Sequence, residues 1–97
     1  MLKKDFYTID YLDDIKATIT LCDETHPVFK AHFPTKPILP GFMNFDIVEE
    51  LFKIKIKTIK KAKFLKTVEP NQTLVYKKNR NSFKVYCKDE VVASFSL

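Results

Sequence analysis

One segment, GFMNFDIVEELFK at residues 41–53, has the apolar spacing of a helix, and it constrains the fold more than any other feature of the sequence. Its apolar side chains cover most of the helix circumference: Phe42, Met43, Phe45, Ile47, Val48, Leu51 and Phe52. A helix that is apolar on most sides is packed inside a protein. The other elements of the chain are therefore expected to surround this helix.

Most of the remaining apolar residues alternate with polar ones, which is the period of a half-buried strand. The alternation is clean at residues 14–22, 82–87 and 91–97, and rougher at 59–65 and 73–78. Turn-forming residues separate the later segments at Asn71-Gln72, Asn79 to Asn81 and Lys88 to Glu90. We expect an α+β fold in which about five antiparallel strands curl around one helix.

The length and composition bound the class of protein. With 97 residues, of which 45% are hydrophobic, the chain is expected to form a single domain over residues 1–97. The stability of so small a domain is expected to depend on a partner subunit. It has no signal-peptide pattern and no apolar run of about 18 residues, so we expect a cytoplasmic protein without membrane insertion. Cys22 and Cys87 lack metal-ligand spacing, which predicts reduced cysteines and no metal site.

The formal net charge of +5 comes mainly from lysines at residues 53–66 and at 77, 78, 84 and 88. These lysines are most simply the solvated face of strands, but they also suit a nucleic acid, or an acidic protein that delivers a substrate, as partner. The sequence has no helix-turn-helix, glycine-rich or zinc pattern, and its one helix is too apolar to lie in a groove of DNA. Nucleic acid is therefore not expected as a partner.

The stretch HFPTKPILPG, residues 32–41, holds three of the five prolines and the only glycine. The prolines make residues 33–40 a stiff extended strap, and Gly41 opens the helix, whose first N–H groups can bind a carbonyl or an anion. His32 lies 14 residues before Asp46. An imidazole, a carboxyl group and exposed N–H groups are suited to proton abstraction next to a carbonyl.

The pattern H-F-P-x-x-P-I-x-P-G-x-x-x-x-D, from His32 to Asp46, resembles the active-site signature of the hotdog-fold dehydratases that act on 3-hydroxyacyl chains bound to acyl carrier protein. Residues 59–74 are similar to the strand and turn that follow the helix in this family. The resemblance implies a hotdog fold, an antiparallel sheet wrapped around one long central helix, in a homodimer or trimer of dimers. The short chain is similar in style to the compact dehydratases of accessory pathways such as aryl-polyene synthesis.

The resemblance also implies the reaction, in fatty-acid or related acyl-chain biosynthesis. His32 would remove the α-proton of a 3-hydroxyacyl thioester, and Asp46 of the other subunit would protonate the leaving hydroxyl, giving the trans-2-enoyl thioester. The N–H groups of Gly41 and Phe42 would hold the thioester oxygen, the carbonyl of Ile38 would orient the histidine ring, and the remaining substrate-binding candidates are Phe33 and Glu50. The family uses no metal or other cofactor, and acyl carrier protein delivers the substrate.

Other interpretations of these residues stay open. Asp46, Glu49, Glu50 and Lys53 have the spacing of a solvent-exposed stripe, and a lone histidine such as His32 is more often structural than catalytic. His26, before Pro27, is interpreted as structural or as lining the entrance. Ala31 and Thr35 stand where the family usually has glycine, and Glu50 where it often has glutamine. The alternative functions are a hotdog thioesterase and a non-catalytic subunit that binds acyl chains or the carrier protein.

Overall fold

The computed structural model describes residues 6–30 and 36–97 of the chain, without the side chain of Lys30. Its elements are β1 (Tyr7–Leu12), β2 (Lys16–Leu21), α1 (Pro27–Lys30), α2 (Met43–Phe52), β3 (Lys61–Phe64), β4 (Thr73–Asn79), β5 (Ser82–Cys87) and β6 (Glu90–Ser96). Within these residues, no helix has both the length and the apolar character that crossing a membrane requires.

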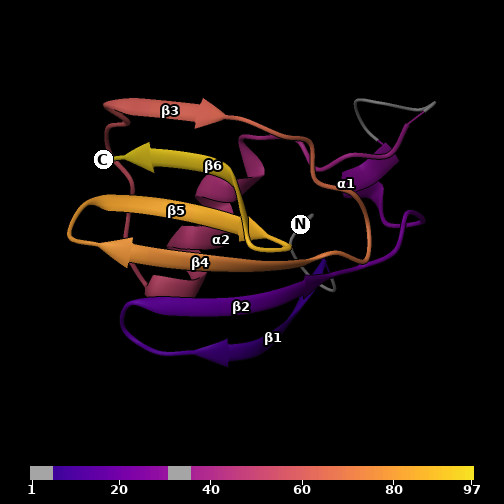
Figure 1. Ribbon diagram of the computed structural model, residues 1–97, viewed down its shortest axis with the longest axis horizontal. Helices are drawn as coiled ribbons and strands as arrows, with labels where there is room; N and C mark the ends of the chain where they lie inside the picture. Colours follow the sequence, from indigo (N-terminus) through magenta and orange to yellow (C-terminus); the bar gives the residue numbers. More distant parts are fainter. Residues whose placement is uncertain (1–5, 31–35) are drawn as a thin grey trace.

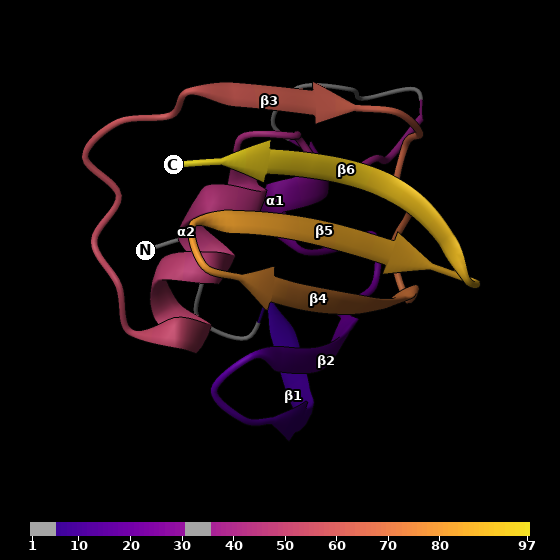
Figure 2. The ribbon, with the colours of Figure 1, turned by 60° about the vertical axis from the view of Figure 1, so that its left-hand side comes forward.

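The six strands form one antiparallel sheet in the order β1-β2-β4-β5-β6-β3. Figures 1 and 2 show that the sheet curves and that α2 lies against its concave face. This arrangement confirms the expected α+β class and the hotdog architecture. β1 and β3 are the two edge strands, and β3 follows the helix directly in the chain.

The strands expected from alternation are confirmed, and one strand is added. β2, β4, β5 and β6 coincide closely with the predicted segments. Of the range predicted from the rough pattern at 59–65, only the shorter strand β3 forms. β1 was not predicted because its residues beyond Tyr7 are exposed on both faces and a bulge between Ile9 and Tyr11 breaks the period of two. The segment between β2 and α2, where the alternation predicts no strand, also contains the short helix α1.

The core lies between α2 and the concave face of the sheet. The helix contributes its buried side, formed by Met43, Asn44, Ile47, Val48 and Leu51. The ring of Phe95 on β6 stacks on Phe83 of β5 at a centroid distance of 5.3 Å, and it forms a T-shaped pair with Phe45 of the helix at 4.9 Å. The opposite side of the helix is open, because Phe42 is 53% exposed. Within the described residues the helix is therefore covered as expected, except on this side.

The outer face of the sheet is polar and cationic. Lys16, Lys77 and Lys84 stand opposite one another on β2, β4 and β5, so they form a row across three neighbouring strands. Like charges placed directly opposite are unfavourable unless water solvates them. The Lys77 ammonium also lies 5.0 Å from the centre of the Tyr86 ring. The row agrees with the interpretation of the strand lysines as a solvated face.

Candidate active site

The segment that leads into α2 is anchored to the sheet side of the molecule. The N–H of Leu39 donates to the carbonyl of Val68 at 2.7 Å, and both side chains are buried. Pro37 and Ile38 are half-buried, whereas Pro40 is buried. Proline restricts its own backbone angles and those of the residue before it, so residues 36–40 enter the helix with a defined backbone direction.

The first turn of α2 directs two N–H groups away from the helix. The carbonyl of Pro40 accepts from the N–H of Met43 at 3.0 Å, and that of Gly41 accepts from the N–H of Asn44 at 3.1 Å. In a trans peptide unit the N–H points opposite to its C=O. The N–H groups of Gly41 and Phe42 therefore point backward from the helix start, where a partial positive charge favours a carbonyl oxygen or an anion.

Gly41 has no unusual backbone angle, but the space next to its Cα atom is tight. Five residues of the described chain have positive φ, and none is glycine: Lys53, Asn71, Arg80, Lys88 and Asp89. A Cβ atom on Gly41 would lie 3.1 Å from three atoms of the Phe64 ring, which is tighter than ordinary contact. Phe64, on the edge strand β3, thus covers the Cα atom of the glycine.

Replacing Gly41 by alanine is expected to change the free energy of unfolding by less than about 1 kcal/mol, because two effects oppose each other. Alanine restricts the unfolded chain, which stabilises by about 0.4–1 kcal/mol, while its methyl group presses on Phe64. In a Phe64→Ala background only the first effect remains, so Gly41→Ala is then expected to stabilise. Urea unfolding of the native protein, the two single variants and the double variant Gly41→Ala/Phe64→Ala measures both the effect on the unfolded chain and the contact with Phe64. Destabilisation in both backgrounds would show that the backbone itself requires glycine.

Asp46 lies on the open side of α2, one helical turn beyond Phe42, and both side chains are exposed. The side chain of Asp46 makes no hydrogen bond or ion pair with the described residues. Positions four apart on a helix share one face, so the carboxyl group lies on the same face as the Phe42 side chain, one turn beyond the helix start where the two N–H groups point away from the helix. The carboxyl group is therefore available to a ligand or a second subunit.

The two other carboxylates of α2 have partners. The hydroxyl of Tyr7, on β1, donates to Oε1 of Glu50, and the N–H of Ile56 donates to Oε2 of Glu49 at 2.8 Å. Burial, and then the bond to Glu50, raise the pKa of the Tyr7 hydroxyl far above its ordinary value, so it stays a donor. Glu50, a candidate substrate contact, is thus held toward the β1 edge.

A buried polar pair behind the helix start was not anticipated. The hydroxyl of Tyr76 on β4 donates to Oδ1 of Asn44 at 2.6 Å, and Nδ2 of Asn44 donates to the carbonyl oxygen of Gly41 at 3.0 Å. Burial raises the pKa of Tyr76 well above its ordinary value. The one available signal in the sequence was an asparagine in the first turn of an otherwise apolar helix face.

Two of the predicted site residues, His32 and Phe33, lie outside the described residues. Of the others, Ile38, Gly41, Phe42 and Asp46 follow one another along the chain into the first turn of α2, and the carboxylate of Glu50 accepts from the hydroxyl of Tyr7. Nδ1 of His26 accepts from the N–H of Val28 at 3.0 Å at the start of α1, which is a structural role. Among residues 6–30 and 36–97, no group of three His, Cys, Asp or Glu side chains is placed to hold a metal ion.

A family model described as ApeI-like, ApeI dehydratase, matches residues 11–96. Among solved structures, the dehydratase heterocomplex ApeI:P from Xenorhabdus doucetiae superposes with a TM-score of 0.68 at 23% identity, covering 95% of this chain and 94% of that chain. An uncharacterized protein from Erwinia carotovora subsp. atroseptica gives 0.53 at 18% identity, with 90% and 85% covered. A mutant form of the phenylacetic acid degradation protein PaaI from Thermus thermophilus gives 0.51 at 10% identity, with 96% and 95% covered. No curated protein sequence matches significantly. At these identities the structural matches establish the fold alone.

Proposed function

Because the chain belongs to the ApeI-like dehydratase family, we propose that it converts a 3-hydroxyacyl thioester to the trans-2-enoyl thioester and water. One observation of the structure carries the proposal. The open side of α2 presents the carboxyl group of Asp46 one turn beyond the outward-pointing N–H groups of Gly41 and Phe42. An acid and a site for a developing oxyanion are two of the three groups that the reaction needs.

His32 supplies the third group in this proposal, as the base. It takes the α-proton, the electron pair of that C–H bond forms the C2–C3 double bond, and the C3–O bond breaks. Asp46 gives its proton to the departing oxygen, which leaves as water. The N–H groups at the helix start hold the thioester oxygen while it carries negative charge. The proton on the imidazole then returns to the carboxylate through solvent, so the protein is unchanged after each turnover.

A second subunit completes the site in this proposal. All four residues of β3 are exposed, and β3 is the last strand in the sheet order, so one of its edges has no strand beside it in the described chain. Phe42, Phe64 and Leu65 are exposed large apolar side chains on or near this edge. An edge strand bordered by apolar side chains is a natural site for association. We propose a second copy of the chain there. A different protein is the alternative, because the Xenorhabdus doucetiae structure is a heterocomplex.

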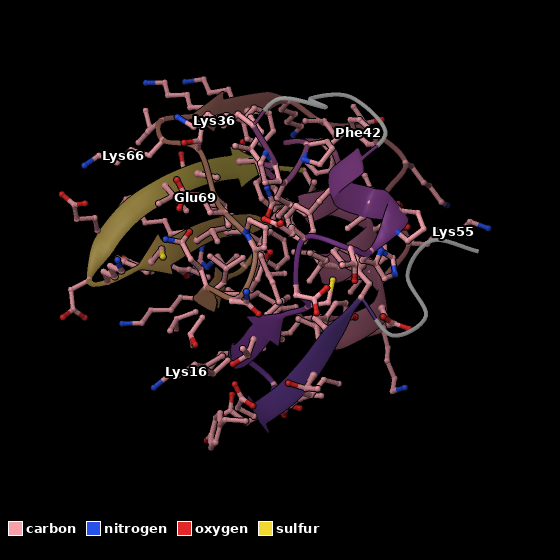
Figure 3. All side chains as sticks on the ribbon, turned by 90° about the vertical axis from the view of Figure 1, so that its right-hand side faces the viewer. Lys16, Lys36, Phe42, Lys55, Lys66 and Glu69 are labelled. Carbon is pink, nitrogen blue, oxygen red and sulfur yellow. The ribbon has the colours of Figure 1, made fainter. Side chains whose placement is uncertain are left out.

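An acyl carrier protein is the proposed source of the substrate. Lys36 precedes the helix start, and Lys61 and Lys63 lie on β3 beside Phe64, so their charge is available to an acidic partner near the site. Figure 3 shows the side chain of Lys36 pointing outward on the same side of the molecule as Lys66. Lys66 is already paired with Glu90 at 2.8 Å, which leaves Lys36 as the better candidate of these two.

The cysteines agree with a cytoplasmic location. Cys22 and Cys87 are both free thiols, and a reducing compartment keeps such thiols from forming disulfides. We therefore place the reaction in the cytoplasm.

The test compares two substrates, a 3-hydroxyacyl N-acetylcysteamine thioester and the same acyl group on an acyl carrier protein, followed by enoyl absorbance. The native protein is expected to dehydrate both. Lys36→Glu is expected to raise KM for the carrier-linked substrate only. Release of free thiol instead of enoyl product would indicate a thioesterase, and carrier binding without conversion would indicate a non-catalytic subunit.

Mixing two inactive variants tests the shared site. A dimer of one His32→Ala chain and one Asp46→Asn chain has one site with both residues intact, if each site combines the two chains. Random mixing makes half of the dimers mixed, so about a quarter of the native activity is expected to return. Activity that stays absent after unfolding and refolding together would mean that both residues act within one chain.

A further inference from the structure

We propose that Asn44 and Tyr76 are positioning residues that hold the peptide unit between Gly41 and Phe42 in the orientation needed to bind the thioester oxygen. The inference rests on the proposed function and adds two residues to it. Tyr76 comes from the centre of β4, and Asn44 from the first turn of α2. Their hydrogen bonds connect the sheet core to the helix start.

The geometry allows only one arrangement of the Asn44 side chain. The Gly41 carbonyl can only accept, so the Asn44 atom facing it at 3.0 Å must be the donor Nδ2. Oδ1 then faces Tyr76, whose hydroxyl donates to it at 2.6 Å. The orientation of the amide is therefore determined at both ends. Asn44 is 5% exposed and Tyr76 0%, so water does not compete for these bonds.

The carbonyl oxygen of Gly41 receives two donors from one residue. The backbone N–H of Asn44 reaches it at 3.1 Å and the side-chain Nδ2 at 3.0 Å. Because the peptide unit is planar and trans, holding this C=O also holds the N–H of Phe42 on its opposite side. Donors on the carbonyl also polarise the unit, which strengthens its N–H as a donor.

An apolar pair would suffice if packing were the only requirement. Asn44 lies on the buried side of α2 with Met43, Ile47, Val48 and Leu51. Burying an amide and a hydroxyl is unfavourable unless both are bonded, and it adds little stability over leucine and phenylalanine of similar shape. The polar pair instead fixes the orientation of the Gly41–Phe42 peptide unit, since a fully hydrogen-bonded buried network specifies one arrangement of its groups.

The test separates stability from positioning by replacing both partners. Tyr76→Phe alone leaves Oδ1 of Asn44 without a donor, so the urea midpoint and kcat are both expected to fall. The double variant Asn44→Leu/Tyr76→Phe removes both polar groups, so its midpoint is expected to recover toward the native value. Its kcat is expected to stay about tenfold below native with KM within about twofold, because substrate still binds while the oxyanion donor is misdirected.

Val85→Ala is the matched control. Val85 is 0% exposed and stands directly opposite Tyr76 on β5, but it makes no hydrogen bond to the helix. The substitution is expected to lower the urea midpoint and to leave kcat unchanged well below the unfolding transition. Equal losses of kcat in Val85→Ala and in the double variant would reduce the pair to a structural role and overturn the proposal.

A spectroscopic measurement decides the inference even if no thioester is turned over. In amide correlation spectra, the double variant is expected to shift the Gly41 and Phe42 signals, while Val85→Ala leaves them in place. Inactivity of the native protein with every thioester, together with this shift, would refute the proposed function and keep the positioning role. Unmoved Gly41 and Phe42 signals in the double variant would refute the positioning role itself.

Discussion

Asp46→Asn is expected to lower kcat for 3-hydroxyacyl thioester dehydration by about 10²- to 10⁴-fold, the usual contribution of a positioned acid. Asparagine has nearly the same shape, but its amide cannot deliver the proton that the departing hydroxyl needs. The side chain is exposed and makes no hydrogen bond or ion pair with the described residues, so the free energy of unfolding is expected to change little. Steady-state kinetics and urea unfolding of the same preparation measure the two effects.

Glu49→Gln is the control for this substitution. Glu49 lies on the same helix, and glutamine keeps an oxygen that can accept from the N–H of Ile56. The control is expected to retain native kcat, which excludes a general effect of removing negative charge from α2. If Asp46→Asn also retains native kcat, Asp46 is part of a solvated stripe and the proposed acid is wrong.

Phe95→Ala is expected to lower the free energy of unfolding by about 3–5 kcal/mol, a large share of the about 5–15 kcal/mol typical of a domain. Phe95 is 3% exposed, and its ring contacts both Phe83 on β5 and Phe45 on α2. Removing the ring leaves a cavity between the helix and the sheet. Because Phe45 is in the first turn of α2, the start of the helix would lose support together with the core. Urea unfolding measures the loss.

Phe64→Ala is the matched control, since Phe64 also forms a T-shaped pair with Phe45, at a centroid distance of 6.1 Å, but is 48% exposed. Its cost is expected to be clearly smaller. Phe95→Leu keeps most of the buried volume and is expected to cost about 1 kcal/mol, which leaves a measurable folded protein if the alanine variant does not fold. Equal costs for Phe95→Ala and Phe64→Ala would show that burial at β6 is not what stabilises the helix.

The strands and the helix were predictable because their patterns are local. A strand with one face in the core alternates, and β2, β4, β5 and β6 all do. β1 carries no such signal, since it is exposed on both faces and interrupted by a bulge. Its place in the sheet depends on pairing with β2, which local periodicity does not report.

The candidate site was predictable only in part. The spacing of Gly41 and Asp46 indicates an N–H donor and an acid on one helix, and their catalytic roles stay predictions. The bonds from Tyr7 to Glu50 and from Tyr76 to Asn44 connect residues 43 and 32 positions apart. No short pattern encodes such contacts, because they exist only after β1 and β4 have been brought against the helix.

The sequence by itself determined the fold class, the helix that the sheet surrounds, and the motif that connects His32 to Asp46. These follow from periodicity and from residue types at set spacings, which act through neighbours along the chain. Tertiary structure decided which carboxylate is available, how the first peptide units of α2 are held, and what packs against residue 41. Gly41 has no positive φ, and a side chain there would press on the Phe64 ring, which the fold brings from β3. Such reasons depend on atoms distant in the chain, so they appear only when the chain is folded.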